Sequence, residues 1–168
     1  TIEAQSNSSW AFHPHLANGW NRPIVYSNFG FNKFTAFEDI FDMSLWERYQ
    51  ANGNDSNFLQ SLVDLNYPGS NMLLRQYISD DYNFRLLIED YENRDKSQPY
   101  FAFNVTMQNH GGYTFRRYSD YEITAKNDQL NETDNIVVSD FTQGVYDADI
   151  AFAALVDYFR NVDEPTVI

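Results

Sequence analysis

A strand pattern at residues 99–107 stands between two amphipathic helix patterns, and this alternation restricts the chain to an α/β class of fold. Residues 100–106 are rich in the aromatic and β-branched side chains that strands favour. The preceding helix starts after Ser79, an N-cap residue, and its apolar residues recur at positions 84, 87, 88 and 91. The following helix, over 137–160, is interrupted by Gly144 and carries an apolar stripe spaced by threes and fours: Val138, Phe141, Val145, Ala148, Phe152, Leu155 and Phe159.

The earlier part of the chain continues the same alternation. Short strands are predicted at 8–12 and 33–37, and a helix over 22–29 has Asn21 as its candidate cap and Gly30 as its stop. Residues 39–69 are expected to be irregular, with short helices near 45–50 and 58–65, and a peripheral strand is predicted at 121–125. A further strand is expected to begin at Thr166. These patterns predict an α/β domain with a mainly parallel sheet flanked by helices, in which strands 9–12 and 100–106 share one sheet and helix 137–160 packs on one face.

Charge and composition exclude several classes of function. Eleven Lys and Arg against 24 Asp and Glu give a net charge of −13, which argues against nucleic acid and against membrane binding through basic residues. An anionic substrate then needs a local cation or a metal. The absence of cysteine excludes disulfides, zinc–thiolate sites and a cysteine nucleophile. No apolar run approaches the ~20 residues of a membrane span. The final residues are those of an interrupted strand, so we expect an internal piece of a larger enzyme.

The three histidines, His13, His15 and His110, each follow the carboxyl end of a predicted strand. Ligands bind at that edge in open α/β sheets. His13 and His15 lie two positions apart, so in an extended segment their side chains share a face and could hold a metal or an anion. The alternative is that one packs under the loop and the other is solvated.

Two further patterns predict an anion site. Trp20-Asn21-Arg22 combines an aromatic plane for a polyol with a guanidinium beside a helix N-terminus, although an exposed Arg next to a core Trp would also fit. The sequence Asn-His-Gly-Gly at 109–112 places His110 on a flexible turn as an acid, a base or a donor to phosphoryl oxygen, or as an incidental loop residue. The carboxylates are scattered along helices and loops, and no pair shows metal-ligand spacing.

Two blocks of this sequence resemble a known family. The first is Ala-Phe-His-Pro at 11–14 with Gly-Trp-Asn-Arg at 19–22, followed by Tyr26 and by residues 30–34; the second runs from 101 to 113 and contains Asn109-His110. Both resemble the lipoteichoic-acid synthase and phosphoglycerol transferase branch of the sulfatase and alkaline-phosphatase superfamily. The resemblance implies that 1–168 is the central part of one sulfatase-like catalytic domain, truncated at both ends, in an extracytoplasmic and membrane-anchored protein.

The resemblance also implies a reaction. A threonine beside a divalent metal, usually manganese, attacks a phosphatidylglycerol headgroup, and a phospho-threonine intermediate passes glycerophosphate to an acceptor hydroxyl on glycerol phosphate or a glycan. Trp20, Arg22 and His110 match the residues that hold glycerophosphate, and His13 matches the histidine that opens the first block. The nucleophile is expected before Thr1 and the Asp-His metal ligands after Ile168. We therefore expect no catalytic residue, no metal ligand and no cofactor in the chain itself, and no turnover by it alone.

Two other functions fit the same residues. One is a sulfatase or phosphoethanolamine transferase of the same superfamily, and the other is a non-catalytic domain that binds a polyol phosphate. Family members often have another residue where His15 stands, so no role is assigned to it.

Overall fold

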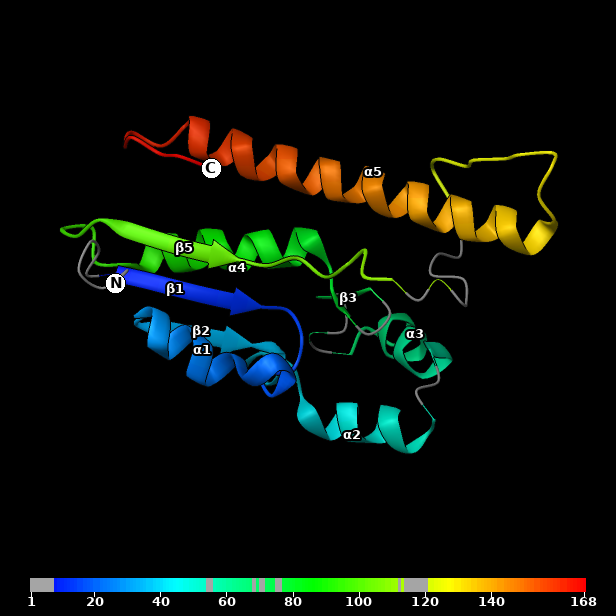
Figure 1. The fold of residues 1–168 in the computed structure, drawn as a ribbon, viewed down its shortest axis with the longest axis horizontal. Helices are drawn as coiled ribbons and strands as arrows, with labels where there is room; N and C mark the ends of the chain where they lie inside the picture. Colours follow the sequence, from blue (N-terminus) through cyan, green and yellow to red (C-terminus); the bar gives the residue numbers. More distant parts are fainter. Residues whose placement is uncertain are drawn as a thin grey trace. The chain divides into compact units, whose positions relative to one another are not determined.

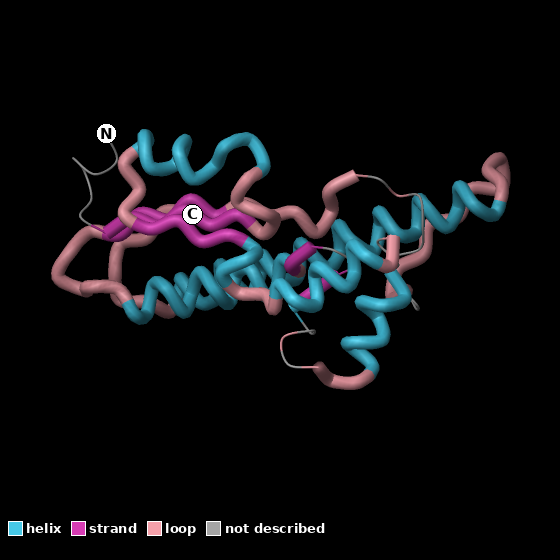
Figure 2. Tube along the Cα trace, turned by 90° about the horizontal axis from the view of Figure 1, so that it is seen from below, coloured by secondary structure: helices cyan, strands magenta, loops and turns pink. Residues whose placement is uncertain are grey.

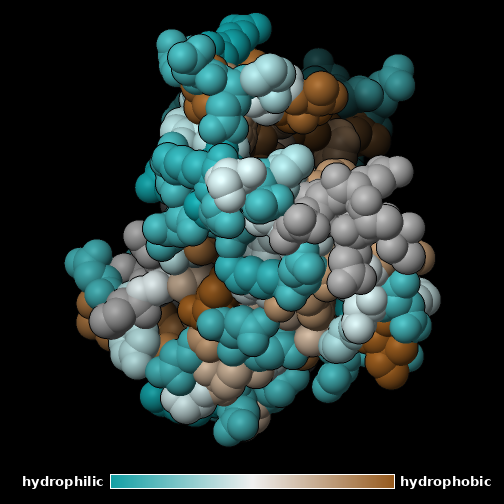
Figure 3. Space-filling view, turned by 90° about the vertical axis from the view of Figure 1, so that its left-hand side faces the viewer, coloured by the Kyte–Doolittle hydropathy of each residue, from teal (hydrophilic) through white to brown (hydrophobic). Residues whose placement is uncertain are grey.

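The computed structural model describes residues 8–53, 56–67, 69, 72–74, 77–111, 113 and 121–168. The chain forms two compact units, Thr1–Met107 and Gln108–Ile168, and each is described by itself. Within the described residues, no helix is both long and apolar enough to cross a membrane. On the face drawn in Figure 3, hydrophilic side chains form most of the described surface, with hydrophobic ones in separate patches.

A three-stranded parallel sheet forms the centre of the first unit (Figure 1). Its strands are β1 (Ser8–His13), β2 (Lys33–Ala36) and β5 (Tyr100–Asn104), in the order β2-β1-β5. Residue 11 of β1 lies between 34 of β2 and 103 of β5. The α/β class, the parallel sheet and the shared sheet of strands 9–12 and 100–106 are confirmed.

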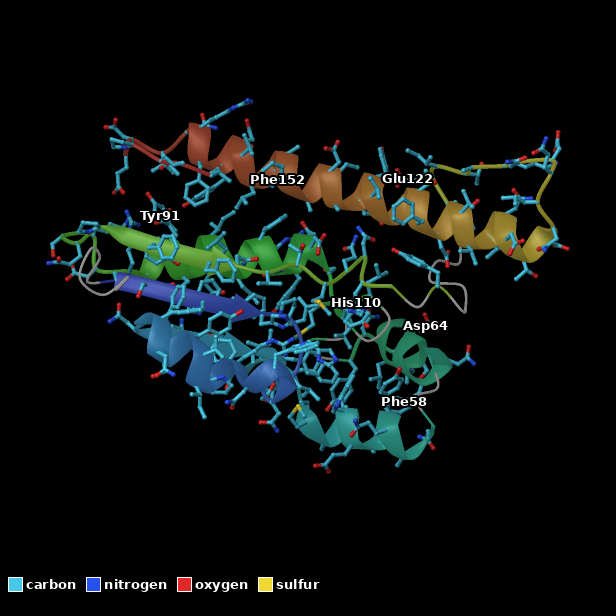
Figure 4. All side chains as sticks on the ribbon, viewed as in Figure 1. Phe58, Asp64, Tyr91, His110, Glu122 and Phe152 are labelled. Atoms are coloured by element: carbon cyan, nitrogen blue, oxygen red, sulfur yellow. The ribbon has the colours of Figure 1, made fainter. Side chains whose placement is uncertain are left out.

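Helices α1 (Arg22–Phe29) and α4 (Asp80–Asn93) lie on opposite sides of this sheet (Figure 2). Alternate strand side chains point to opposite faces, so Phe34 of β2 meets Tyr26 of α1 with ring centroids 4.9 Å apart. On the other face Tyr100 of β5 meets Tyr91 of α4, labelled in Figure 4, with centroids 5.9 Å apart. Both predicted helices are confirmed.

The central strand β1 carries the core of this unit because it has a neighbour on each side. Trp10, Ala11 and Phe12 are all buried, and Phe12 is fully so. Full burial of one such aromatic side chain stabilises the fold by roughly 1.5–3 kcal/mol. The strand therefore holds its last residue, His13, in a fixed position at the carboxyl end of the sheet.

The segment between β2 and α4 is made of short elements. A 3₁₀ turn, η3 (Phe37–Asp39), leads to α2 (Met43–Ala51) and α3 (Ser56–Asp64), which confirms the two expected short helices. Asp42 caps α2, because its carboxylate accepts the amide of Ser44 at 2.9 Å. Two strands that the sequence did not predict follow, β3 (Leu73–Leu74) and β4 (Tyr77–Ile78), paired antiparallel.

The long helix α5 (Glu132–Arg160) dominates the second unit. Asn131 caps it by accepting the amide of Asp134 at 2.9 Å, so the helix begins before the predicted position 137. The strand predicted at 121–125 is wrong: the backbone amides of Glu122 and Ile123 donate to Oε1 of Gln143, at 2.7 and 3.0 Å, instead of to a neighbouring strand. The strand expected from residue 166 is also wrong, because 165–168 have no regular secondary structure.

Candidate functional site

The topology of the sheet indicates that a ligand would bind at the carboxyl ends of its strands. From β1 the chain crosses to β2 on one side, and it later returns to β5 on the other side. In open α/β sheets, ligands bind at the carboxyl ends of strands where the strand order reverses in this way. Val105, just beyond β5, still donates to the carbonyl of Phe12 at 3.1 Å, so both chains leave the sheet side by side. His13 ends β1 at this point.

The loop from 14 to 21, which follows His13, is tied to the rest of the unit at several places. The backbone amide of Ala17 donates to both carboxylate oxygens of Glu38, at 2.9 and 3.0 Å. Nη1 of Arg22 donates to the carbonyl of Leu16 at 2.8 Å. The Leu16 carbonyl and the Ala17 amide belong to one peptide group, so a guanidinium and a carboxylate fix this part of the backbone between His13 and α1.

Arg22 is the first residue of α1, and only 9% of its surface is exposed. In the described part of the chain, no carboxylate lies within ion-pair distance of its guanidinium, and Leu16 is its hydrogen-bond partner. Gly19 leaves space for the group, since a Cβ there would lie 3.2 Å from Cζ and 3.4 Å from Nη2. A buried cation needs a compensating anion, so this arrangement suits an anionic ligand.

His13 is buried beside this cation, with 6% of its surface exposed. Its Nδ1 atom makes no hydrogen bond within the described chain. Burial lowers the pKa of His13 from 6.5 to about 4; the positive charges of Arg22 and His15 act in the same direction, and a backbone hydrogen bond at His15 acts against it. His13 is therefore neutral at pH 7, and its buried Nδ1 has a hydrogen-bonding capacity that a water, an ion or a ligand can satisfy.

Trp20 lies in the short η2 turn (Gly19–Asn21) with 88% of its surface exposed, so it is not a core residue. Its φ of 59° is left-handed, a conformation that costs a residue such as Trp about 1–2 kcal/mol; Asn21, with φ of 54°, is left-handed too, but asparagine adopts this region more readily. Such strain clusters at functional sites. Asn21 occupies the N-cap position as predicted, but its side chain makes no capping hydrogen bond.

His15 takes a structural position. Its ring lies 5.9 Å from the ring of Tyr77, and its carbonyl accepts the amide of Phe37. In the described ranges, no three His, Asp or Glu side chains are grouped as metal ligands. The divalent metal expected from the family therefore has no complete ligand set among these residues.

His110 is exposed on the loop after β5, labelled in Figure 4, and it belongs to the second unit. Its neighbour Asn109 donates to the carbonyl of Gly144 on α5 at 2.9 Å. Gly112, the last residue of the predicted turn, lies outside the described residues. The convergence of His110 with Trp20 and Arg22 stays a prediction, whereas the other three candidate residues belong to one unit.

Sequence reasoning missed two supporting residues, Glu38 and Asn83. The fully buried Asn83 donates to the carbonyl of Val105 at 2.6 Å and accepts from Asn104 at 2.8 Å, which fixes the end of β5 against α4. The sequence does contain a signal for Asn83, because its position in α4 places it on the same buried helix face as Leu87 and Tyr91. Glu38 has no comparable signal, since only the folded loop brings it to Ala17.

Comparison with known proteins agrees with this fold. A putative cyclic β-1,2-glucan modification protein of Rhizobium meliloti (strain 1021) is 30% identical over 160 residues, which are 95% of this chain and 20% of that protein. The lipoteichoic acid synthase LtaP of Listeria monocytogenes superposes with a TM-score of 0.59 at 16% identity, over 92% of this chain and 30% of that one. The phosphoglycerol transferase GacH of Streptococcus pyogenes, in complex with sn-glycerol-1-phosphate, gives 0.61 at 22% identity, over 94% and 34%.

The chain thus spans a fifth to a third of the length of these proteins. The two structures show that it has the fold of the corresponding part of LtaP and GacH. The family model called Sulfatase matches residues 7–168, nearly the whole sequence. The chain therefore belongs to the sulfatase family.

Proposed function

We propose that this chain supplies the glycerophosphate-binding residues of a phosphoglycerol transferase, which moves glycerophosphate from a phosphatidylglycerol headgroup to an acceptor hydroxyl. The observation that carries the proposal is the buried Arg22 guanidinium without a carboxylate partner in the described chain. Its paired donors match the oxygens of a phosphate ester. The GacH complex with sn-glycerol-1-phosphate supports glycerophosphate as the ester.

Each candidate residue has a distinct part in this proposal. Arg22 binds the phosphoryl oxygens and offsets the negative charge that develops on them during transfer. His13, neutral at pH 7, offers a ring nitrogen for a hydrogen bond to the phosphate ester. The exposed ring of Trp20 forms a wall against the carbon face of glycerol. His110 donates a further hydrogen bond to a phosphoryl oxygen.

The bond-making groups belong, in this proposal, to other parts of a longer, extracytoplasmic and membrane-anchored polypeptide. The oxygen of a threonine bonds to phosphorus while the bond to the diacylglycerol oxygen breaks, and diacylglycerol leaves as the protonated alcohol. The acceptor hydroxyl then displaces the threonine in the same way. A divalent metal such as manganese, when bound, lowers the pKa of the threonine hydroxyl.

A glycan hydroxyl is the acceptor that the comparisons favour. The Rhizobium relative, which matches 95% of this chain, is named for the modification of a cyclic glucan. We therefore propose a glucan as the acceptor, ahead of a glycerol phosphate chain.

A titration of the chain with sn-glycerol-1-phosphate tests the binding role. We expect Arg22→Ala to weaken binding at least tenfold, because a charge-assisted hydrogen bond contributes roughly 1.5–3 kcal/mol. Arg85→Ala is the matched control, since Arg85 is an exposed residue of α4 paired with Asp81. Equal weakening by both variants would show that only the overall charge acts. Tighter binding of sulfate or phosphoethanolamine than of glycerophosphate would favour a sulfatase or a phosphoethanolamine transferase.

A turnover assay tests the catalytic part. The chain and the longer polypeptide that contains it are each incubated with manganese and a fluorescent phosphatidylglycerol. We expect release of diacylglycerol by the longer polypeptide alone. Metal-dependent release by the chain, abolished in Arg22→Ala, would show that the catalytic core lies within it. A longer polypeptide that binds glycerophosphate without turnover would be a non-catalytic binding domain.

A further inference from the structure

Two consecutive side chains that precede His110 are fixed on one carbonyl of α5. Nε2 of Gln108 donates to the carbonyl of Gly144 at 3.3 Å, and Nδ2 of Asn109 donates to the same oxygen at 2.9 Å. In a regular helix this oxygen already accepts the backbone amide of the fourth residue onward. The two amide groups are therefore additional donors that converge on a single point of the helix.

The residues around this point are arranged to hold the loop in place. Gln108 is 3% exposed and Gly144 is buried, so water competes little for these bonds. On the far side of His110, the hydroxyl of Tyr113 donates back to the carbonyl of Asn109 at 2.8 Å. The ring of Tyr113 lies edge-on against Phe141 of α5, with centroids 5.9 Å apart. Contacts to α5 thus flank His110 on both sides.

The residue that accepts these two hydrogen bonds is a glycine in the middle of a long helix. Glycine costs a helix about 1 kcal/mol relative to Ala, and α5 carries Gly144 well inside its length. The carbonyl of this glycine is the one that accepts both side-chain amides.

We infer that Gln108 and Asn109 are positioning residues for His110, which they hold in place through the carbonyl of Gly144. The inference rests on the phosphate-binding role proposed above for His110. A hydrogen bond from His110 to a bound phosphate contributes more to affinity if the imidazole is already held in one orientation, since ordering a loop on binding reduces affinity. The side chains of Gln108 and Asn109 touch no substrate in this scheme.

The main variant is Asn109→Asp, which keeps the size of the side chain and removes the donor. Asn161→Asp is the matched control, because the amide of Asn161 also donates to a carbonyl of α5, that of Asp157, at 2.8 Å. Each change is made in the full chain, alone and together with His110→Ala. Asn109→Ala serves as a second variant, which removes the donor without adding a charge.

Two readouts separate the inference from the proposed function. The first is the NMR signal of the His110 imidazole without ligand, which we expect to broaden or shift toward an averaged environment in Asn109→Asp and to stay unchanged in Asn161→Asp. The second is the dissociation constant for sn-glycerol-1-phosphate. We expect Asn109→Asp to raise this constant about tenfold, because one hydrogen bond to a charged group is lost. In the His110→Ala background, Asn109→Asp should cause no further increase.

Two outcomes overturn the inference. An unchanged imidazole signal in both Asn109 variants would show that the loop does not depend on Gly144. Equal weakening of binding by Asn109→Asp with and without His110 would show a direct charge effect on the ligand. If Arg22→Ala leaves binding unchanged, the proposed function fails, and the ligand-free imidazole signal still decides whether Asn109 positions His110.

Discussion

Replacement of Gly19 by alanine should weaken glycerophosphate binding without removing any charged or polar group. The added Cβ would lie 3.2 Å from Cζ of Arg22 and closer still to Nη1. Carbon atoms in ordinary contact are separated by about 3.5–4.0 Å, so the guanidinium must move by roughly 1 Å. A displacement of that size is enough to take the hydrogen bond from Nη1 to Leu16, now 2.8 Å, out of range.

The expected magnitude follows from what the displaced guanidinium does. Because it lies at the end of a flexible side chain, it can move without unfolding the loop, and we expect a loss of stability of less than about 1 kcal/mol. A paired arginine–phosphate contact depends on geometry, and a misplaced one forfeits hydrogen bonds worth about 1.5–3 kcal/mol. That loss corresponds to a rise of roughly ten- to a hundredfold in the dissociation constant.

Calorimetric titration with sn-glycerol-1-phosphate, together with urea unfolding of the same variants, checks this prediction. Gly53→Ala is the complementary control, because its φ of 72° strains an alanine while nothing lies near the added Cβ. It should lose about 1 kcal/mol of stability and keep its affinity. Unchanged affinity in Gly19→Ala, or equal losses of affinity in both variants, would refute the placement of the anion beside Arg22.

Three further predictions concern the same site. Burial lowers the pKa of His13 to about 4 in the folded chain, against 6.5 in the unfolded chain. Between these two pH values the unfolded state binds a proton that the folded state does not bind. The stability due to a neutral His13 is therefore complete above pH 6.5 and is lost as the pH falls toward 4. Between pH 6.5 and pH 4, the free energy of unfolding measured with urea should fall by on the order of 2–3 kcal/mol more in the wild type than in His13→Gln. Glu38→Ala should destabilise the chain by about 1–2 kcal/mol and weaken glycerophosphate binding, with Glu38→Gln recovering part of both because its oxygen still accepts a hydrogen bond; thermal unfolding and titration measure these effects. Spin labels can be attached through Asn21→Cys and Gly111→Cys, since the chain has no cysteine of its own. With glycerophosphate bound, the distance between the labels should be short and narrowly distributed. A long distance, with the labels on opposite faces, would refute the convergence of Arg22 with His110.

The elements that the sequence predicted correctly are those with local signals at their ends. Ser79 accepts the amide of Tyr82 and starts α4, and Gly30, with φ of 88°, ends α1. These features depend on neighbours within a few residues, so a single sequence reveals them. The pair of strands β3 and β4 has only two residues in each strand, too short for an alternating pattern.

Partners distant in sequence explain the errors. Residues 121–125 have the composition of a strand, but Gln143 of α5 supplies the acceptor that a neighbouring strand would have supplied. The chemistry of the candidate site was readable from residue types, as with the aromatic and guanidinium groups of Trp20 and Arg22. Its supports were not readable, because Glu38 reaches Ala17 only after the chain has crossed from β1 to β2.

The acidity of the chain makes the isolation of Arg22 informative. With 24 acidic residues for 11 basic ones, cations are the scarce partner, and exposed cations do find carboxylates: Lys33 pairs with Asp90, Arg85 with Asp81, and Lys96 with Glu92. Exposed pairs of this kind contribute little, about 0–1 kcal/mol. A buried guanidinium has far more to gain from a partner, because its desolvation is otherwise uncompensated. Arg22 lacks a carboxylate in the described chain although carboxylates are in excess, and this contrast supports the proposal that an anionic ligand binds beside it.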